Sequence, residues 1–282
     1  MTALLALLSA LFIGSADFLG GMTSRSANGI RVAAFVSVVG MPPALAVSLV
    51  DTGTTLTHAD VAWSVVAGVV VSLGIGCFYI GMGRGLISVV APVAAVTGAV
   101  IPVVYALARG ERPGPVALVG LVIAFFAVAV VSLAPSDQHP DAPAVDGFVI
   151  ALSIGAGTFF GLFYISFSRV SEDAGMWPVT IERAAATVVL CVLVLLLTRG
   201  PFSGALRVLP AVVAIAVLEV AAVIPLLLAL QRGPVAVASV VASLYPVMTV
   251  LLAGLVLRER LSRLQYIGVA CALVSVALVS SG

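Results

Sequence analysis

The chain has 282 residues, of which 62% are hydrophobic and 9% are charged, and its formal net charge is +1. With a mean hydropathy of +1.28, it has too few charged side chains to cover a water-facing surface. All thirteen basic residues are arginines and acids nearly balance them; this excludes the basic surface of a protein that binds nucleic acid.

Long runs of Val, Leu, Ala and Ile, without alternation, predict helices that span a lipid bilayer rather than a β-barrel. Charges and Gly/Pro clusters divide the chain into ten such segments. The first lacks a basic leader and a cleavage pattern, so we expect a span rather than a signal peptide. In chain order the predicted spans are 2–22, 30–50, 61–82, 86–107, 114–134, 147–167, 177–198, 209–230, 234–257 and 264–281.

The sequence contains an internal repeat. Three short motifs recur 148 residues later: Arg84-Gly85, Glu111-Arg112 and Gly120 reappear as Arg232-Gly233, Glu259-Arg260 and Gly268. We predict a first five-helix repeat over 1–134, a Pro- and Asp-rich linker over 135–146 and a second repeat over 147–282. An odd number of spans gives the halves opposite topology, and such inverted repeats around a central cavity are typical of secondary transporters.

Further residues in both halves carry a resemblance to a known family. The first half contains Tyr79, Gly83-Arg84-Gly85, Pro92, Pro102 and Gly110-Glu111-Arg112; the second contains Leu230-Gln231-Arg232-Gly233, Ala238-Ser239, Leu244-Tyr245-Pro246 and Arg258-Glu259-Arg260-Leu261. Over nearly its whole length the chain resembles the EamA family of the drug/metabolite transporter superfamily. One departure is Gly98, which stands in the first half where the second has Pro246. The resemblance implies a multi-pass protein of the plasma (inner) membrane that moves small metabolites such as amino acids, often outward, through a cavity lined by spans 1, 3, 4, 6, 8 and 9.

Charged residues inside predicted spans are the strongest candidates for function, because a charge at the bilayer centre costs about 2.5 kcal/mol or more. Glu219 lies near the middle of the eighth span, six residues before Pro225. It is predicted to be a proton or cation site, with a structural hydrogen bond as the alternative. Asp17 shares a face with small residues and is a second candidate, unless it only reaches interfacial water. Glu182-Arg183, at the start of the seventh span, is predicted to be an interfacial ion pair or a partner of a cavity carboxylate.

Aromatic and hydroxyl side chains in the predicted cavity spans are further candidates for contact with a solute. Core packing is the alternative for the aromatic residues, and bonding to the backbone for the serine. Prolines that interrupt predicted helices are candidates for gating, with static kinks as the alternative. The candidate solute residues are Tyr79, Phe160, Tyr164, Ser239 and Tyr245; the candidate gating residues are Pro92, Pro102, Pro225 and Pro246.

No Arg or Lys lies deep in a predicted span, so a phosphorylated solute finds no cationic partner and buried carboxylates favour an amine-bearing, zwitterionic or neutral one. The sequence predicts a non-ATP secondary transporter of amino-acid or amine-like solutes that exports by alternating access, with proton coupling through Glu219. The alternatives are a flippase for lipids or lipid-linked sugars, and a membrane enzyme. No HExxH, GxSxG or GxxxxGK[ST] motif occurs, so we expect no catalytic residue, metal or cofactor. Oligomeric state and membrane orientation stay open.

Overall fold

The computed structural model is a bundle of helices, with no strand among the residues that it describes. The described residues are 1–24, 28–51, 54–84, 87–133, 147–198, 205–256 and 262–281. The predicted linker and the Arg258–Leu261 motif lie outside the described residues, as do Arg25, Gly85 and Arg199. The all-α class predicted from hydropathy is confirmed.

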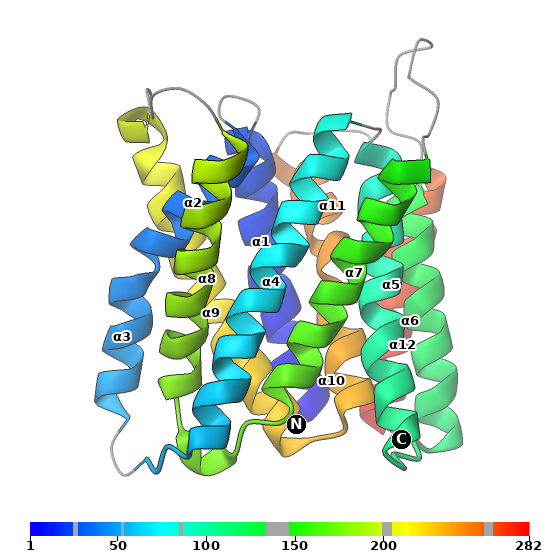
Figure 1. Cartoon of the computed structure of the whole chain (residues 1–282). Coiled ribbons are helices and arrows are strands. Elements are labelled where there is room, and N and C mark those ends of the chain that lie inside the picture. The colour runs from blue at the N-terminus through cyan, green and yellow to red at the C-terminus, as the bar shows by residue number, and fades with distance from the viewer. Residues whose placement is uncertain are drawn as a thin grey trace.

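The helices follow one another with short connections (Figure 1). In the first half they are α1 (Thr2–Ser24), α2 (Gly29–Val39), α3 (Met41–Val50), α4 (His58–Arg84), α5 (Ile87–Ala108) and α6 (Pro115–Leu133). In the second half they are α7 (Gly147–Phe167), the 3-10 turn η1 (Glu172–Ala174), α8 (Trp177–Leu197), α9 (Ala205–Arg232), α10 (Val235–Ala242), α11 (Tyr245–Val256) and α12 (Arg263–Ser281).

Ten helical segments match the ten predicted spans. Among the described residues, seven are long and apolar enough to cross a membrane, and three shorter apolar helices lie in α5, α6 and α12. Two spans are broken helices: α2 and α3 share the span Gly29–Val50, and α10 and α11 share Val235–Val256. The sequence predicted residues 30–50 as one unbroken span. The break falls at Gly40 because Pro42 and Pro43 follow it and, lacking N–H groups, can only begin a new helix.

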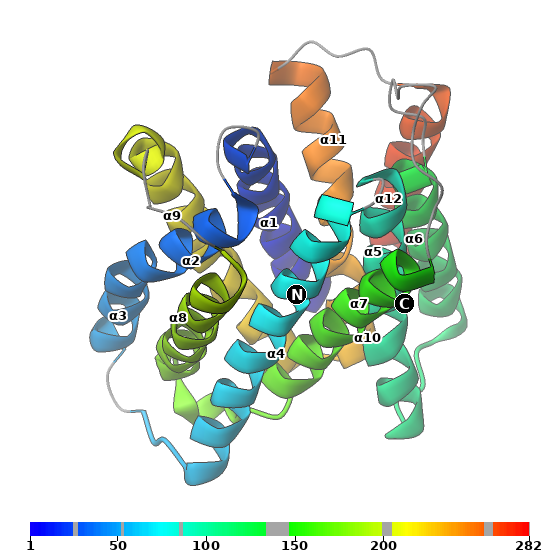
Figure 2. The same cartoon turned by 45° about the horizontal axis from the view of Figure 1, so that its top comes forward.

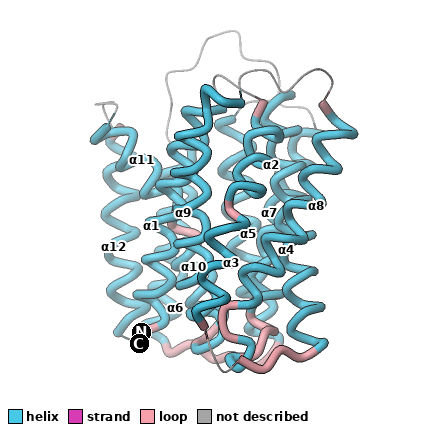
Figure 3. Tube along the Cα trace, turned by 90° about the vertical axis from the view of Figure 1, so that its left-hand side faces the viewer, coloured by secondary structure: helices cyan, strands magenta, loops and turns pink. Residues whose placement is uncertain are grey.

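The two halves run in opposite directions. Both termini lie at the same end of the bundle, which we call the termini end (Figures 1 and 3). The first half ends at the opposite end after five passes, so the second half starts there and each of its helices is antiparallel to its counterpart. The 148-residue offset also reproduces helix bounds: residues 87–108 of α5 become 235–256, which spans α10 and α11, and residues 115–133 of α6 become 263–281, which is α12.

The halves interlock rather than forming separate bodies. The most extensive helix contacts all join the two halves: α6 with α12, α1 with α9, α4 with α7 and α8, and α5 with α7. In Figure 2, α1 lies between α9 and α11. Small residues permit close approach. A β-carbon on Gly157 of α7 would lie 2.5 Å from the Ala94 carbonyl oxygen of α5, and one on Gly120 of α6 would lie 3.0 Å from the Val279 amide nitrogen of α12.

Candidate functional site

An ion pair lies inside the bundle. Arg183 of α8 donates from Nη1 to Oε2 of Glu219, near the middle of α9, at 2.7 Å. The arginine side chain is 7% exposed and the glutamate side chain 36%. The expectation that no arginine lies deep in a span is therefore wrong: Arg183, the seventh residue of α8, is buried and reaches Glu219 near the middle of α9. Of the two interpretations of Glu182-Arg183, the structure shows the partner of an interior carboxylate.

Asp17 of α1 lies close to this pair. Its carboxylate interacts electrostatically with Glu219, and protein atoms surround it. Asp17 is nevertheless an exposed residue, whereas Ala16 and Phe18 beside it are buried. The Asp17 carboxylate therefore faces neighbouring helices while the residue itself stays accessible to solvent. Asp17 thus points inward, as its small-residue face indicated.

Two of the predicted tyrosines join Asp17. Both Tyr164 of α7 and Tyr245, the first residue of α11, interact electrostatically with it. Tyr164 is buried, its hydroxyl lies within hydrogen-bonding reach of the Ser243 side chain, and its ring packs 5.8 Å from that of Phe163. Tyr245 is partly exposed. The site therefore combines carboxylates, one guanidinium and phenol rings.

Three other predicted residues make different contacts. Ser239 is fully buried, and its hydroxyl donates to the Val235 carbonyl of its own helix at 2.7 Å. Phe160 packs with Phe78, with ring centroids 6.3 Å apart, in a contact between α7 and α4. Tyr79 lies against Gly29 at the start of α2, where a β-carbon would clash with its ring. No described contact joins these three residues to the carboxylates.

The predicted gating prolines differ in their local structure. Helix α5 runs unbroken through Pro92 and Pro102, and α9 runs unbroken through Pro225. Only Pro246, the second residue of α11, accompanies a break, which falls at Ser243 and Leu244 between α10 and α11. There the Leu244 amide bonds to the Val241 carbonyl at 3.2 Å, a three-residue spacing typical of a tightened turn.

A hydrogen-bond network, which we call the termini-end seal, joins the end of α3 and the start of α4 in the first half to the α7–α8 loop and α9 of the second half. Figure 3 shows loops at this end of the bundle. Asp60 accepts from the Ser171 amide at 2.8 Å, and Asp51 accepts from the Met176 amide at 2.8 Å. Gln231, near the end of α9, donates to the Ser171 carbonyl at 2.7 Å. The sequence analysis missed these residues. One local signal was available: Thr57 and Asp60 bond reciprocally as a capping box at the start of α4.

Glu111 adds a further link at the same end. Its two carboxylate oxygens accept from the Val235 and Ala236 amides, at 2.9 and 3.2 Å. These are the first residues of α10, whose preceding residue, Pro234, provides no side-chain cap. A carboxylate at a helix N-terminus satisfies free N–H groups and favours the helix dipole. Glu111 of the first half thus caps a helix of the second half.

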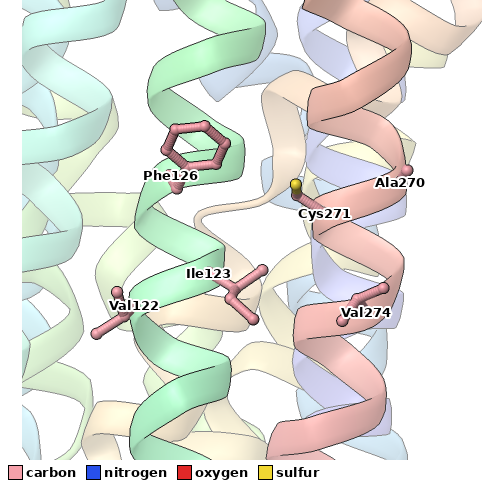
Figure 4. A pocket seen from close by; sticks show the side chains of 6 residues that line it. All are labelled: Val122, Ile123, Phe126, Ala270, Cys271 and Val274. Carbon is pink, nitrogen blue, oxygen red and sulfur yellow. The ribbon is translucent and has the colours of Figure 1, made fainter.

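A hollow of about 400 Å³ lies between α6 and α12 (Figure 4). It is lined by apolar side chains alone: Val122, Ile123, Phe126, Ala270, Cys271 and Val274. Val122, Phe126 and Val274 are at least half exposed, so this hollow is part of the outer surface that contacts lipid. It has no polar group that could orient a solute.

Ten apolar segments in two inverted halves, with charged residues paired in the interior, define a multi-pass membrane transporter. The EamA-like transporter family model matches residues 1–133 and again 147–281. The chain belongs to the EamA-like transporter family, within the drug/metabolite transporter superfamily, as its motifs indicated. A lipid bilayer and a small-molecule solute are therefore its partners.

The fold also occurs among solved structures, of which 28 chains match. One crystal structure of a protein aligns with a TM-score of 0.76 at 15% sequence identity, over 99% of this chain and 96% of that chain. At this identity the likeness shows the fold alone. Comparison of the sequence with curated proteins gives no match.

Proposed function

We propose that this chain is a secondary transporter of the plasma membrane that exports amino-acid or amine-like solutes by alternating access, without ATP. The observation that carries the proposal is the charge of the interior. Two carboxylates, those of Glu182 and Glu219, interact with the Arg183 guanidinium, and a third, that of Asp17, interacts with Glu219. The formal excess is two negative charges, and a solvent-accessible space of this sign concentrates cationic groups.

The repeat supports a specific role for these residues. Counterparts of Arg183 and Glu219 at the 148-residue offset are Phe35 and Val71, both apolar. Helix α7, the counterpart of α1, contains no charged residue at all. Residues that occur at matching positions in both halves serve the shared helical scaffold. The charged residues Asp17, Arg183 and Glu219 occur in one half only and so break the symmetry between the halves. A costly charge that the scaffold does not require is expected to serve the solute.

The pair can exchange partners with an amino acid. A solute ammonium competes with Arg183 for Glu219, and the released guanidinium can donate two hydrogen bonds to the solute carboxylate. One buried ion pair replaces another. Solute binding therefore needs little additional desolvation free energy, because Arg183 and Glu219 are already removed from water. Binding then stays weak enough for release. The rings of Tyr164 and Tyr245 offer apolar faces to a solute side chain.

Alternating access requires that one end closes while the other opens. The termini-end seal and the Glu111 cap support a conformation closed at the termini end, and the exposure of Asp17 supports access from the opposite end. In the opposite conformation these hydrogen bonds must break. The α10–α11 break at Pro246 is the proposed hinge; Pro92, Pro102 and Pro225 are proposed as secondary flexible points in unbroken helices.

The test is counterflow in proteoliposomes that contain labelled amino acids, amines or neutral sugars. We expect saturable exchange of an amino acid or amine by the wild type and at least a tenfold loss in Glu219→Gln. The matched control is Glu172→Gln, because Glu172 is an exposed glutamate at the termini end; it should exchange like the wild type. Exchange that Glu219→Gln leaves unchanged would exclude the site. Movement of a fluorescent lipid, without exchange of any soluble solute, would establish the flippase instead.

A further inference from the structure

Glu182 is a buried acid whose environment leaves it incompletely bonded. It lies on α8 next to Arg183, is 3% exposed, and among the described residues its Oε2 atom has no hydrogen-bond partner. Helix α4 packs directly on it, since a β-carbon on Gly68 would collide with the Glu182 carbonyl oxygen. An ionised carboxylate in such a place is strongly disfavoured unless a cation pairs with it.

Among the described residues, the cation that interacts with Glu182 already has another partner. Arg183 interacts electrostatically with Glu182, but its hydrogen bond goes to Glu219 at 2.7 Å. The Nε atom of Arg183 is buried and has no partner among the described residues. The guanidinium therefore has a spare donor beside a carboxyl group with a spare oxygen, while its charge is balanced by the other carboxylate.

Among the side chains that the structure describes on the packed helices, no other charged group compensates Glu182. Helices α2, α3, α4 and α9 contact α8. At this level α2, α3 and α4 present hydroxyls and glycine to α8: Ser37 bonds to Thr187, Ser48 to Thr180, and Ser72 to the Ala186 carbonyl. On α9 the charged group that faces Glu182 is Glu219.

The titratable side chains described on α2 and α4 lie elsewhere. Arg31 bonds to Thr198 at the far end of α8, and Asp60 belongs to the termini-end seal. His58 is exposed at the start of α4, the Cys77 sulfur lies near Gly155 of α7, and Tyr79 lies against Gly29. None of them is placed to neutralise Glu182.

We propose that Glu182 is a proton-binding site, protonated while Arg183 pairs with Glu219, and that the two glutamates compete for this one arginine. The inference rests on the proposed function and specifies its coupling. When a solute of net positive charge takes Glu219, Arg183 turns to Glu182, whose proton then leaves to the accessible space. One cationic group is bound and one proton is released, so the net charge of the site is unchanged.

This exchange makes the carrier an antiporter of protons against cationic solutes, whereas a zwitterionic amino acid, whose carboxylate pairs with the released Arg183, releases no proton. With both glutamates ionised, one would remain unpaired in the interior; with both protonated, Arg183 would remain unpaired. Both combinations are costly, so the carrier is confined to two states, one holding the proton and one holding the solute. Because the proton and the solute cannot be bound at the same time, the movement of one is coupled to the movement of the other.

Infrared spectroscopy of the purified protein tests the proton directly, without a solute. We expect the carbonyl stretching band of a protonated carboxylic acid near neutral pH in the wild type and in the exposed-site control Glu172→Gln. The band should be lost in Glu182→Gln. Glu182→Met, of similar length and apolar, provides the same readout if the glutamine variant folds poorly. A band that survives both substitutions, or a wild type without one, would overturn the proposal.

A transport arm separates this proposal from the proposed function. Proteoliposomes with a trapped pH dye receive a gradient of lysine or, separately, of choline. Proton movement should follow the solute in the wild type and in Glu172→Gln, and be lost in Glu182→Gln. Proton movement that persists in Glu182→Gln would refute coupling through Glu182. If labelled lysine, choline and the counterflow panel all fail to move, the proposed function fails, and the infrared band alone decides whether Glu182 holds a proton.

Discussion

Asp60 on α4 and Ser171 after α7 are joined by a hydrogen bond of 2.8 Å between residues of the two repeats. The Asp60 carboxylate also accepts from the Thr57 amide at 3.0 Å and from its hydroxyl at 2.6 Å. Asp60 is 2% exposed, so these three donors satisfy an otherwise buried charge. One carboxylate thus holds the start of α4 and closes the termini end.

Substitution of Asp60 by alanine should weaken both the start of α4 and the closure of the termini end. The three donors lose a charged acceptor, and we expect the free energy of unfolding to fall by about 2 kcal/mol or more. Thermal unfolding in detergent measures this. The matched control is Asp173→Ala: its side chain is exposed, and its described link to Thr55 uses the backbone carbonyl, so stability should be nearly unchanged. Equal loss in both variants would contradict the assigned role of Asp60.

Glu111→Gln should destabilise the start of α10. A neutral amide keeps only one acceptor for the Val235 and Ala236 amides and removes the charge at the helix N-terminus. We expect a loss of about 1 kcal/mol. Hydrogen–deuterium exchange of residues 235–238 should become faster. Arg112→Gln, in the same loop and exposed, is the control and should leave this exchange unchanged.

The fold was predictable because each helix follows from the hydropathy of its own segment of the sequence. Apolar runs long enough to span a bilayer give the helices, and Glu111 and Gly120, which recur as Glu259 and Gly268, reveal the repeat. The break at Gly40 was missed although Pro42 and Pro43 were visible, since an apolar run does not tell whether a span is one helix or two.

The site was only partly predictable. Glu219 and Asp17 stood out because a carboxylate in an apolar span is rare. For Arg183 the sequence left two interpretations open, an interfacial ion pair or a partner of a cavity carboxylate, because hydropathy does not show which neighbour a long side chain reaches. Its partner is 36 residues away on another helix. The bond between Asp60 and Ser171 joins residues 111 positions apart, and no local pattern encodes such a contact.

Pro246→Ala should stiffen the joint between α10 and α11. Alanine supplies the N–H that proline lacks, so the Ala242 carbonyl can accept a helical hydrogen bond. The corresponding position in the first half is Gly98, and α5 is unbroken there. We expect amide exchange at residues 243–247 to slow several-fold and solute exchange to slow with little change in apparent affinity.

The control for this change is Pro210→Ala. Pro210 is exposed and lies in α9, which is unbroken, so its replacement should leave residues 243–247 unaffected. If Pro246→Ala exchanges its amides as fast as the wild type, the break does not depend on the proline, and Pro246 is not the hinge.

Two glycines of α7 provide a test of the contact that holds the repeats together. A β-carbon on Gly157 would lie 2.5 Å from the Ala94 carbonyl oxygen and 2.6 Å from the Thr97 β-carbon, both on α5. On Gly155, two residues earlier, the nearest atom would be the Cys77 sulfur at 3.8 Å, an ordinary contact. Gly157→Ala should therefore push α7 away from α5, with a loss of about 1–3 kcal/mol in the free energy of unfolding. Gly155→Ala should be neutral or stabilise α7 by up to about 1 kcal/mol, since alanine favours the helix more than glycine.

Thermal unfolding of both variants in the same detergent makes the comparison. The two substitutions have the same helix propensity change, so only the close approach of α5 can separate their unfolding temperatures.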